Sequence, residues 1–287
     1  MGQRDLFAKF HTLQDQLWVE QLIRSTVNPT VRKSVFPPLP DEQLQWDLVG
    51  SVGEETLRHA SRFYLEIKGS LERHEVELGS NACVLDLGCG FGRHLRFFLK
   101  DVPANRLFGA EVNARAIRAC KATMPQVNSL LIPYSGFSPF TNHVFHLVYA
   151  HSVFSHLSRG LADTWVGELA RILEPGGLAI ITTHRRAFID YVVELRNREH
   201  LPHRWQRNVT HLGFPNPQES RDQYDDGQFI YFATTPTGFG AFAPENYGTA
   251  LIPQSYVERH WSTDFRLLDF VDDRDRLEQA ILVMQRK

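Results

Sequence analysis

The sequence predicts an α/β fold in which a largely parallel sheet is covered by helices on both faces. Short apolar segments alternate with amphipathic segments between residues 83 and 183, a pattern typical of parallel strands joined by helices. Two further strand-like segments, 265–270 and 280–284, are joined by the charged turn 272–275, and strands joined so closely pair antiparallel. We therefore expect five parallel strands followed by a C-terminal antiparallel hairpin.

The parallel strands are expected where short apolar runs occur between turn residues. They are the segments 83–87, 107–111, 130–132, 145–150 and 178–182. The amphipathic stretches between and after them predict helices at 92–100, from Asn113 or Ala114 to about Met124, at 161–173 and at 255–261. We expect Ser255 to cap the last of these helices, because a serine side chain satisfies free N–H groups at a helix start.

Residues 1–79 are expected to form a helical extension or cap. Apolar residues at three- and four-residue spacing predict one helix over about residues 1–30, ended by Asn28-Pro29. These apolar residues are Leu6, Phe7, Phe10, Leu13, Leu17 and Leu22. After the proline-rich linker 36–40, Asp41 can cap a short helix. A longer helix is expected from Gly53 to Leu78.

Residues 80–287 are expected to form the α/β domain, with residues 185–250 as an insert after the fifth strand. This insert is rich in aromatics, histidines, prolines and glycines and has little periodicity, which suits a loop region that covers a substrate. Its aromatics either contact a substrate or form a small core of the insert, and the sequence leaves both open. They include Tyr224, Tyr231, Phe239, Phe242 and Tyr247.

Composition excludes several classes of protein. The chain has 287 residues and a formal net charge of -2, whereas a nucleic-acid-binding domain is normally basic. Cys83, Cys89 and Cys120 have no metal-type spacing, and their odd number argues against a disulfide framework. The 13 histidines form no HExxH motif, so we expect no metal site. No apolar run is long enough for a signal peptide or a membrane span, and we expect a cytoplasmic protein.

The segment 84–94 reads Val-Leu-Asp-Leu-Gly-Cys-Gly-Phe-Gly-Arg-His. An apolar strand runs into Asp86, and glycines follow at positions 88, 90 and 92. Glycine allows a positive φ and a close approach of a ligand to the backbone. The following helix offers free N–H groups and its positive dipole end. A strand, a glycine loop and a helix therefore predict a nucleotide-type cofactor site at the carboxyl edge of the sheet.

Over about residues 80–287 the chain resembles the class I S-adenosylmethionine-dependent methyltransferases. Four blocks carry the resemblance, in the order and spacing of that family: 86–92, 109–113 (Gly-Ala-Glu-Val-Asn), 145–157 and 171–178 (Arg-Ile-Leu-Glu-Pro-Gly-Gly-Leu). The resemblance implies a Rossmann-like seven-stranded sheet, S-adenosyl-L-methionine as cofactor and S-adenosyl-L-homocysteine as product. A finer similarity, at 36–40, 152–157, 182–184 and 247–250, is to methyltransferase domains of surface-glycan or secondary-metabolite pathways.

The resemblance also implies cofactor-binding roles for particular residues. Asp86 accepts hydrogen bonds from the α-amino group of the cofactor, and Glu111 accepts them from both ribose hydroxyls. Val112 either packs on the adenine or is an ordinary core residue. The chain lacks the acid that many relatives have after the third strand, and Ser135, or a backbone group at Gly136, would take that part. The remaining expected contacts come from Gly88, Cys89, Gly90, Gly92 and Arg93.

Three histidines are candidates for a base or for binding the substrate. His151 ends the fourth strand beside the expected methyl group, so it is both a cofactor-contact and a catalytic candidate. His184 ends the fifth strand and is the second candidate base. His156 either takes part in catalysis or supports the next helix.

The expected function is methyl transfer to an oxygen or nitrogen of a small-molecule or glycan-type acceptor. One alternative is an NAD(P)-dependent oxidoreductase, although its loop prefers G-x-G-x-x-G and here Gly92 comes after a single intervening residue. The other alternative is a non-catalytic module that keeps the methyltransferase fold. The N-terminal helix can pack on the core or join a dimer, so an oligomer through the N-terminal helices stays open.

Overall fold

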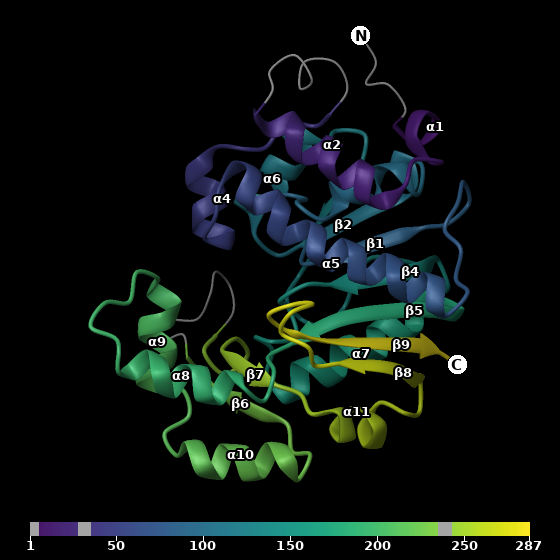
Figure 1. Ribbon diagram of the computed structural model, residues 1–287. Helices are drawn as coiled ribbons and strands as arrows, with labels where there is room; N and C mark the ends of the chain where they lie inside the picture. Colours follow the sequence, from purple (N-terminus) through teal and green to yellow (C-terminus); the bar gives the residue numbers. More distant parts are fainter. Residues whose placement is uncertain (1–5, 28–35, 235–242) are drawn as a thin grey trace. The chain divides into compact units, whose positions relative to one another are not determined.

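The computed structural model describes residues 6–27, 36–234 and 243–287. Its main sheet has seven strands in the order β3-β2-β1-β4-β5-β9-β8, with helices packed around it (Figure 1). Neighbouring strands from β3 to β4 pair in parallel, and β9 pairs antiparallel with both β5 and β8. The expected α/β fold with a C-terminal antiparallel pair is confirmed.

The strands of this sheet are β1 (Val84–Leu87), β2 (Leu107–Glu111), β3 (Asn128–Leu131), β4 (Phe145–Ala150), β5 (Leu173–Thr183), β8 (Phe265–Val271) and β9 (Ala280–Arg286). A second, two-stranded antiparallel sheet is formed by β6 (Ile230–Phe232) and β7 (Thr249–Leu251). Strands β2 and β4 have the bounds expected from the sequence. Strand β3 begins two residues earlier, and β5 begins at Leu173 and takes in the Pro-Gly-Gly run before the expected start.

The helices are α1 (Leu6–Phe10), α2 (Asp15–Val27), α4 (Glu42–Val49), α5 (Gly53–Arg73), η1 (Leu95–Lys100), η2 (Ala104–Arg106), α6 (Ala114–Thr123), α7 (Arg159–Ile172), α8 (Phe188–Arg196), α9 (Arg204–Leu212), α10 (Pro217–Asp225) and α11 (Gln254–His260). The expected cap at Asp41 is present, since its side chain accepts from Leu44 N. Asn113 caps α6, and its side chain accepts from Arg115 N and Ala116 N.

The chain divides into two compact units. The first comprises the described residues up to Ile132 together with Val144–Tyr149, and the second comprises Pro133–His143 and Ala150–Lys287. In the first unit α2 lies alongside α5 (Figure 1). The indole of Trp18 is fully buried and donates to Phe97 O at 2.7 Å. The N-terminal helices are therefore packed onto η1, the element that follows the glycine loop.

The expected single N-terminal helix is wrong, because α1 ends at Phe10 and α2 begins at Asp15. The break lets the ring of Phe10 fold against Trp18 and Phe36, with centroids 5.2 and 6.0 Å away. It also places the Asp15 carboxylate in the first turn of α2, where the helix dipole favours a negative charge. The expected end at Asn28-Pro29 lies outside the described residues.

Three other expected element bounds are corrected. Helix α5 ends at Arg73, because Glu75 adopts a positive φ of 56° and Val76 N closes back onto Leu71 O, which is a helix-ending pattern. The turns after the glycine loop lead into the 3-10 helix η1 instead of an α-helix from residue 92. Ser255 is not a cap: α11 begins at Gln254, after Pro253.

The segment 185–250 is more regular than the sequence indicated. Helices α8, α9 and α10 and strands β6 and β7 surround an apolar core of their own. Among the aromatics singled out above, Tyr224 belongs to this core, and the Tyr231 hydroxyl donates to Pro244 O at 2.6 Å. Phe239 and Phe242 lie outside the described residues. The core consists of Ile189, Val192, Val209, Phe214, Tyr224, Ile230 and Leu251.

Candidate functional site

The glycine loop, residues 86–92, is held in the first unit by backbone hydrogen bonds. Gly88 N and Cys89 N both donate to Ala110 O, at 2.8 and 3.2 Å. Gly88, Gly90 and Gly92 have φ values of 76°, 55° and 80°, a region that strongly favours glycine. The loop thus depends on glycine at each of these positions.

Gly90 and Gly92 differ in their surroundings. A Cβ added at Gly92 would lie 2.1 Å from Met124 Cε and 2.9 Å from Cys120 Sγ, whereas one added at Gly90 would meet nothing within 4 Å. Gly92 therefore seats the loop against α6, while the backbone at Gly90 faces open space that a ligand could approach.

Glu111 ends β2 and is bound to the loop itself. Its Oε2 accepts from Gly90 N at 2.8 Å, and its Oε1 accepts from Val112 N and Asn113 N, both at 2.8 Å. Burial raises the pKa of this carboxyl, and the three backbone donors oppose that rise. Since a carboxylate has about four acceptor positions, about one remains for a further donor. Glu111 therefore also links β2 to the glycine loop, a role that the sequence did not predict.

Asp86 is the buried acid at the start of the loop, with 1% of its surface exposed. Tyr149 on β4 lies opposite it in register. Neither Asp86 Oδ2 nor the Tyr149 hydroxyl makes a hydrogen bond of ordinary geometry within the described part of the chain. Burial raises the pKa of Asp86 well above its usual range and the neighbouring Cys120 adds to the rise, while the half-buried Arg93 and the Tyr149 hydroxyl oppose it. A donor or a cation placed at Oδ2 would relieve this state.

Cys89 is buried within the loop. Its thiol is buried and is turned inward, within reach of a Cβ added at Gly109 and of the Cys120 thiol. Hydrogen bonds from Cys89 and Ser129 lower the pKa of Cys120 to about 7. Val112, the expected adenine contact, is half-buried just after β2.

In the second unit, the segment after β3 is anchored to α7. The Ser138 backbone N and hydroxyl both donate to Glu168 Oε1, at 2.8 and 2.5 Å, and Arg171 also donates to this carboxylate. A Cβ at Gly136 would lie 2.5 Å from Thr164 Cγ2. Ser135, the proposed substitute for the missing acid, is exposed beside it.

The three candidate histidines all lie in the second unit and are half-buried. The rings of His156 and His184 meet edge to face, with centroids 5.9 Å apart. His184 also stacks on Phe188 at 3.8 Å, and Tyr247 stacks on His156 at 4.9 Å. The structure brings His156 and His184 together in one aromatic cluster.

Burial sets the charge of this cluster. It lowers the pKa of His156, with a hydrogen bond from the ring to Gly248 O opposing the change. It lowers the pKa of His184 well below its usual range, and the neighbouring His156 adds to this. Because a histidine normally titrates near about 6.5, both rings are neutral at pH 7. Neutral imidazole is the form that can accept a proton.

The sequence did not predict a role for three residues of the second unit, Ser152, Thr182 and Gln279. Ser152, at the exit of β4, has a positive φ of 57°, and its backbone N donates to Thr182 Oγ1 at 2.8 Å. Gln279, directly before β9, bonds both Ser152 and Thr182. The sequence block 145–157 contains Ser152 and could have pointed to it, whereas no sequence signal marks Gln279.

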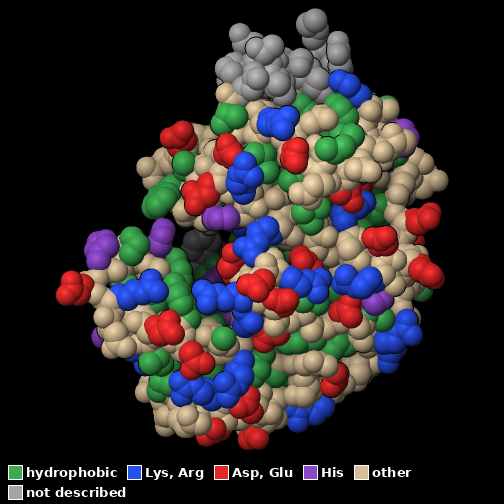
Figure 2. Space-filling view, in the orientation of Figure 1, with side chains coloured by type: hydrophobic (Ala, Val, Ile, Leu, Met, Phe, Trp, Pro, Cys, Tyr) green, Lys and Arg blue, Asp and Glu red, His purple; other side chains and the backbone are tan. Residues whose placement is uncertain are grey.

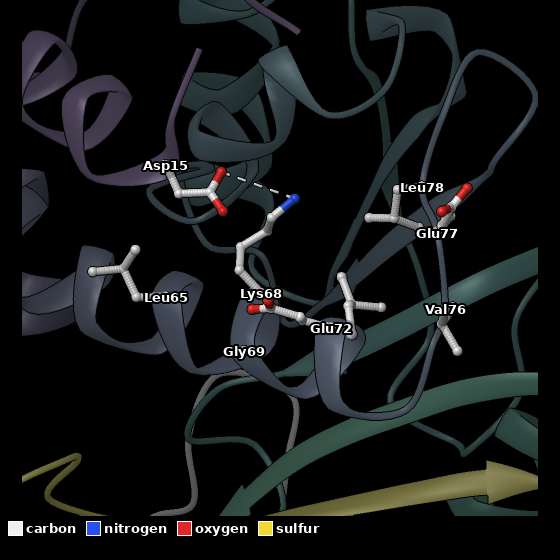
Figure 3. Close-up of a pocket in the computed structure, with 9 residues that line it drawn as sticks. Asp15, Leu65, Lys68, Gly69, Glu72, Val76, Glu77 and Leu78 are labelled. Carbon is white, nitrogen blue, oxygen red and sulfur yellow. Dashed lines mark ion pairs between the residues drawn. The ribbon is translucent and has the colours of Figure 1, made fainter. Parts of the chain in front are cut away.

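A surface hollow of about 530 Å³ is lined by residues of the first unit (Figure 3). Lys68 points into it, and its charge is met by Asp15 at 3.9 Å and by Asp101 at 2.7 Å. None of the predicted site residues lines it. The lining consists of Asp15, Leu65, Lys68, Gly69, Leu71, Glu72, Val76, Glu77 and Leu78.

The described ranges hold neither a group of side chains suited to a metal ion nor a membrane-spanning helix. Within them, no three or more His, Cys, Asp or Glu side chains gather as a metal site would require. No helix in the same ranges is long and apolar enough to cross a membrane. Figure 2 shows acidic and basic side chains mixed on the face in view, without a continuous basic stripe.

Comparisons with known proteins agree with this fold. Residues 84–177 match the family described as a methyltransferase domain. The chain is 30% identical over 110 residues to trans-aconitate 2-methyltransferase of Azoarcus sp. (strain BH72), which covers 38% of this chain and 42% of that protein. It is 25% identical over 131 residues to an uncharacterized protein of Rickettsia prowazekii (strain Madrid E), covering 44% and 52%. The matches thus span about half the length of these curated relatives.

The fold is similar to that of a solved S-adenosylmethionine-dependent methyltransferase from Clostridium acetobutylicum ATCC 824. The TM-score is 0.52 at 12% identity, covering 84% of this chain and 96% of that one. The family match contains the glycine loop and Glu111, and the strand order agrees with the fold that the resemblance implied. Residues 84–177 are therefore similar to a methyltransferase domain, and they lie within a fold that is similar to that of a solved S-adenosylmethionine-dependent methyltransferase.

Proposed function

We propose that the protein transfers a methyl group from S-adenosyl-L-methionine to an oxygen or nitrogen of a small-molecule or glycan-type acceptor. The observation that carries this proposal is the buried Asp86 Oδ2. It makes no hydrogen bond of ordinary geometry in the described residues, where the Tyr149 hydroxyl is its neighbour, and it lies at the head of a glycine loop inside the matched segment. A buried acceptor without a partner is costly, and the cofactor's ammonium group supplies the donor and the charge that this atom lacks.

The residues around the loop fit the rest of the cofactor. Glu111 keeps about one acceptor position for a ribose hydroxyl, and Gly90 leaves room for close approach. Gly88, Cys89, Gly92 and Arg93 then act through the backbone or charge of the loop, and Val112 through contact with the adenine. Ser135, Gly136 and His151 remain proposed cofactor contacts from the second unit.

The bound cofactor would supply a methyl group on a sulfonium, which is already a good electrophile. The chain's own residues must then orient the acceptor and remove its proton. His151, His156 and His184 are the candidates for that task. The expected division into residues 1–79 as a cap, 80–287 as the methyltransferase domain and 185–250 as a substrate cover belongs to this proposal.

A small acceptor is favoured over a nucleic acid. The net charge of -2 and the mixed charges in Figure 2 do not suit binding to a phosphate backbone. The relative from Azoarcus is named for a small carboxylic acid, which supports a small-molecule acceptor here. All three cysteines are free, as suits a reducing compartment such as the cytoplasm. Association through the N-terminal helices stays a prediction, for which the exposed Leu17 on α2 is a candidate contact.

Calorimetry on the full chain tests the proposal. We expect S-adenosylhomocysteine to bind and NAD(P) not to bind. Binding of the dinucleotide alone would overturn the proposal in favour of an oxidoreductase. A panel of small hydroxyl, carboxyl, amine and sugar acceptors, assayed by formation of S-adenosylhomocysteine, then separates oxygen from nitrogen acceptors. A chain that binds the product and methylates no panel member at any pH would favour the non-catalytic alternative.

A further inference from the structure

The exit of β4 is held in a strained conformation by one closed set of hydrogen bonds. Ser152 has a φ of 57°, which is unfavourable for a residue with a Cβ and needs support from its surroundings. Its backbone N donates to Thr182 Oγ1 at 2.8 Å, and the Thr182 hydroxyl donates to Gln279 Oε1 at 2.5 Å. Thr182 is fully buried, so this arrangement has little freedom.

Gln279 completes the set from the start of β9. Because its Oε1 accepts from Thr182, its Nε2 is directed to the serines and donates to Ser152 Oγ at 3.1 Å and to Ser155 Oγ at 3.3 Å. Ser152 Oγ therefore already accepts one hydrogen bond, and its own hydrogen is available for a different partner. Two groups lie within reach of that hydrogen: Ser155 Oγ at 3.4 Å and Nε2 of the His156 imidazole at 3.5 Å.

The backbone of Gly248 fixes the protonation state of His156. Nδ1 of His156 lies 2.8 Å from Gly248 O, and Gly248 N donates to His156 O at 2.8 Å. A carbonyl oxygen only accepts, so Nδ1 must carry the hydrogen of the neutral ring, and Nε2 is left as the acceptor. Tyr247 on one face and the edge of His184 hold the ring in place.

We propose that Ser152 and His156 together take the proton of the acceptor, and that Gln279 is the positioning residue that aligns them. This inference rests on the proposed function and selects His156 among the three candidate histidines. In the transfer, the acceptor oxygen would bond to the methyl carbon as the carbon–sulfur bond of the donor breaks, with the electron pair of that bond left on sulfur. The acceptor's O–H bond breaks and its hydrogen goes to Ser152 Oγ, while the Ser152 hydrogen goes to His156 Nε2. The positive charge of the sulfonium donor ends on the imidazolium of His156, so charge and protons balance.

The tautomer of His156 tests the pair without any acceptor. In long-range ¹H–¹⁵N spectra of the full chain labelled at histidine, we expect His156 near pH 7 to show protonated Nδ1 and unprotonated Nε2. His156→Gln assigns the signal by removing it. Gln279→Met should shift the Nε2 resonance, because it frees Ser152, and Gln285→Met should not. Gln285 is a matched control on β9, where its side chain donates to Gly176 O.

Turnover tests the consequence with any acceptor found in the panel. His156→Gln should lower kcat about 100-fold, as expected for loss of a general base. Gln279→Met should lower it about tenfold, since a small misplacement of a reacting group is costly. The Kd of S-adenosylhomocysteine should be unchanged in both variants and in Gln285→Met.

Two results would overturn the assignment of the pair. One is a wild-type His156 that carries its proton on Nε2. The other is a Gln279→Met variant whose spectrum and kcat match those of the wild type. Failure of the wild type to bind S-adenosylhomocysteine would instead overturn the proposed function, and the tautomer measurement keeps these two failures apart.

Discussion

The glycine loop of the first unit and the histidine cluster of the second differ in how far apart their contacting residues lie along the sequence. Glu111 reaches Gly90 across 21 positions, and the other contacts of this carboxylate are to its immediate neighbours. In the cluster, His156 meets Gly248 across 92 positions and Ser152 meets Gln279 across 127. A locally built site can be recognised from a motif, whereas the cluster exists only once the chain has folded.

The two regions also differ in how well their polar groups are satisfied. At the loop, Asp86 Oδ2 makes no hydrogen bond of ordinary geometry among the described residues, and burial raises the pKa of the same carboxyl. In the cluster, Ser152, Thr182, His156 and Gln279 satisfy one another. Buried groups without partners reduce stability. The loop is therefore the place where a ligand adds stability, and the cluster is organised before any ligand arrives.

Substitution of Gly90 and Gly92 in the loop should produce the largest effects and separate binding from folding. Gly92→Ala should lower stability by about 2–4 kcal/mol, because it combines a strained φ with a clash against Met124 and Cys120. Gly90→Ala meets no such clash and should cost only about 1–2 kcal/mol. Chemical denaturation measures both.

The same pair should reverse its order in affinity for the cofactor. A methyl group at Gly90 occupies the open side of the loop, so Gly90→Ala should weaken binding of S-adenosylhomocysteine more than a folded Gly92→Ala does. Calorimetry at a temperature where both variants are folded measures this. Equal losses of affinity in the two variants would show that the open side of Gly90 is not where the cofactor approaches.

Asp86→Asn should move stability and affinity in opposite directions. Because the folded-state pKa of Asp86 is raised, the carboxyl destabilises the protein as pH rises from the ordinary Asp range through that raised value. The amide removes this penalty and should raise apo stability at pH 7 by about 1–3 kcal/mol. It also removes the charge that meets the ammonium group, so affinity should fall about 10–100-fold. A variant with unchanged affinity would remove Asp86 from the site.

The affinity for S-adenosylhomocysteine should depend on pH through the same carboxyl. Protonated Asp86 cannot balance an ammonium charge, so binding should weaken as pH falls through the raised pKa of Asp86, by up to about tenfold per pH unit. The decline should begin above about pH 4, where an ordinary aspartate is still ionised. Calorimetry across this range, with Asp86→Asn as the comparison, measures it, and an equal slope in both chains would assign the effect to other groups such as Glu111.

The sequence predicts the locally built glycine loop better than the histidine cluster, whose contacts join distant segments. Strand β2, strand β4 and the glycine loop could be located because an apolar run and a turn motif are local signals. The sequence did not predict the helices of the segment 185–250, because their apolar residues face a small core to which β6 and β7 also contribute. Gln279 was missed because glutamine beside a strand has no distinctive pattern, and its role arises only from partners on two other segments.

The cluster should respond to Thr182→Val through stability and histidine chemistry, with no change in cofactor affinity. Valine keeps the shape of threonine but leaves Ser152 N and Gln279 Oε1 without their partner, so stability should fall by about 1–3 kcal/mol. Thr183→Val is the matched control, since Thr183 Oγ1 accepts from Ile252 N at 3.1 Å and is equally buried. Its stability should fall by a similar amount.

The two threonine variants differ in what else they change. Thr182→Val releases Ser152 and Gln279 together, so the Nε2 resonance of His156 should shift, whereas Thr183→Val should leave it in place. Both should bind S-adenosylhomocysteine like the wild type, because Asp86 and Glu111 keep their surroundings in the first unit. If Thr183→Val also shifted the resonance, the hydrogen bonds around Ser152 would merely report general loosening of β5. A shift confined to Thr182→Val would mean that this one set of hydrogen bonds aligns His156. It would also mean that hydrogen bonds between distant segments can be altered without disturbing the glycine loop.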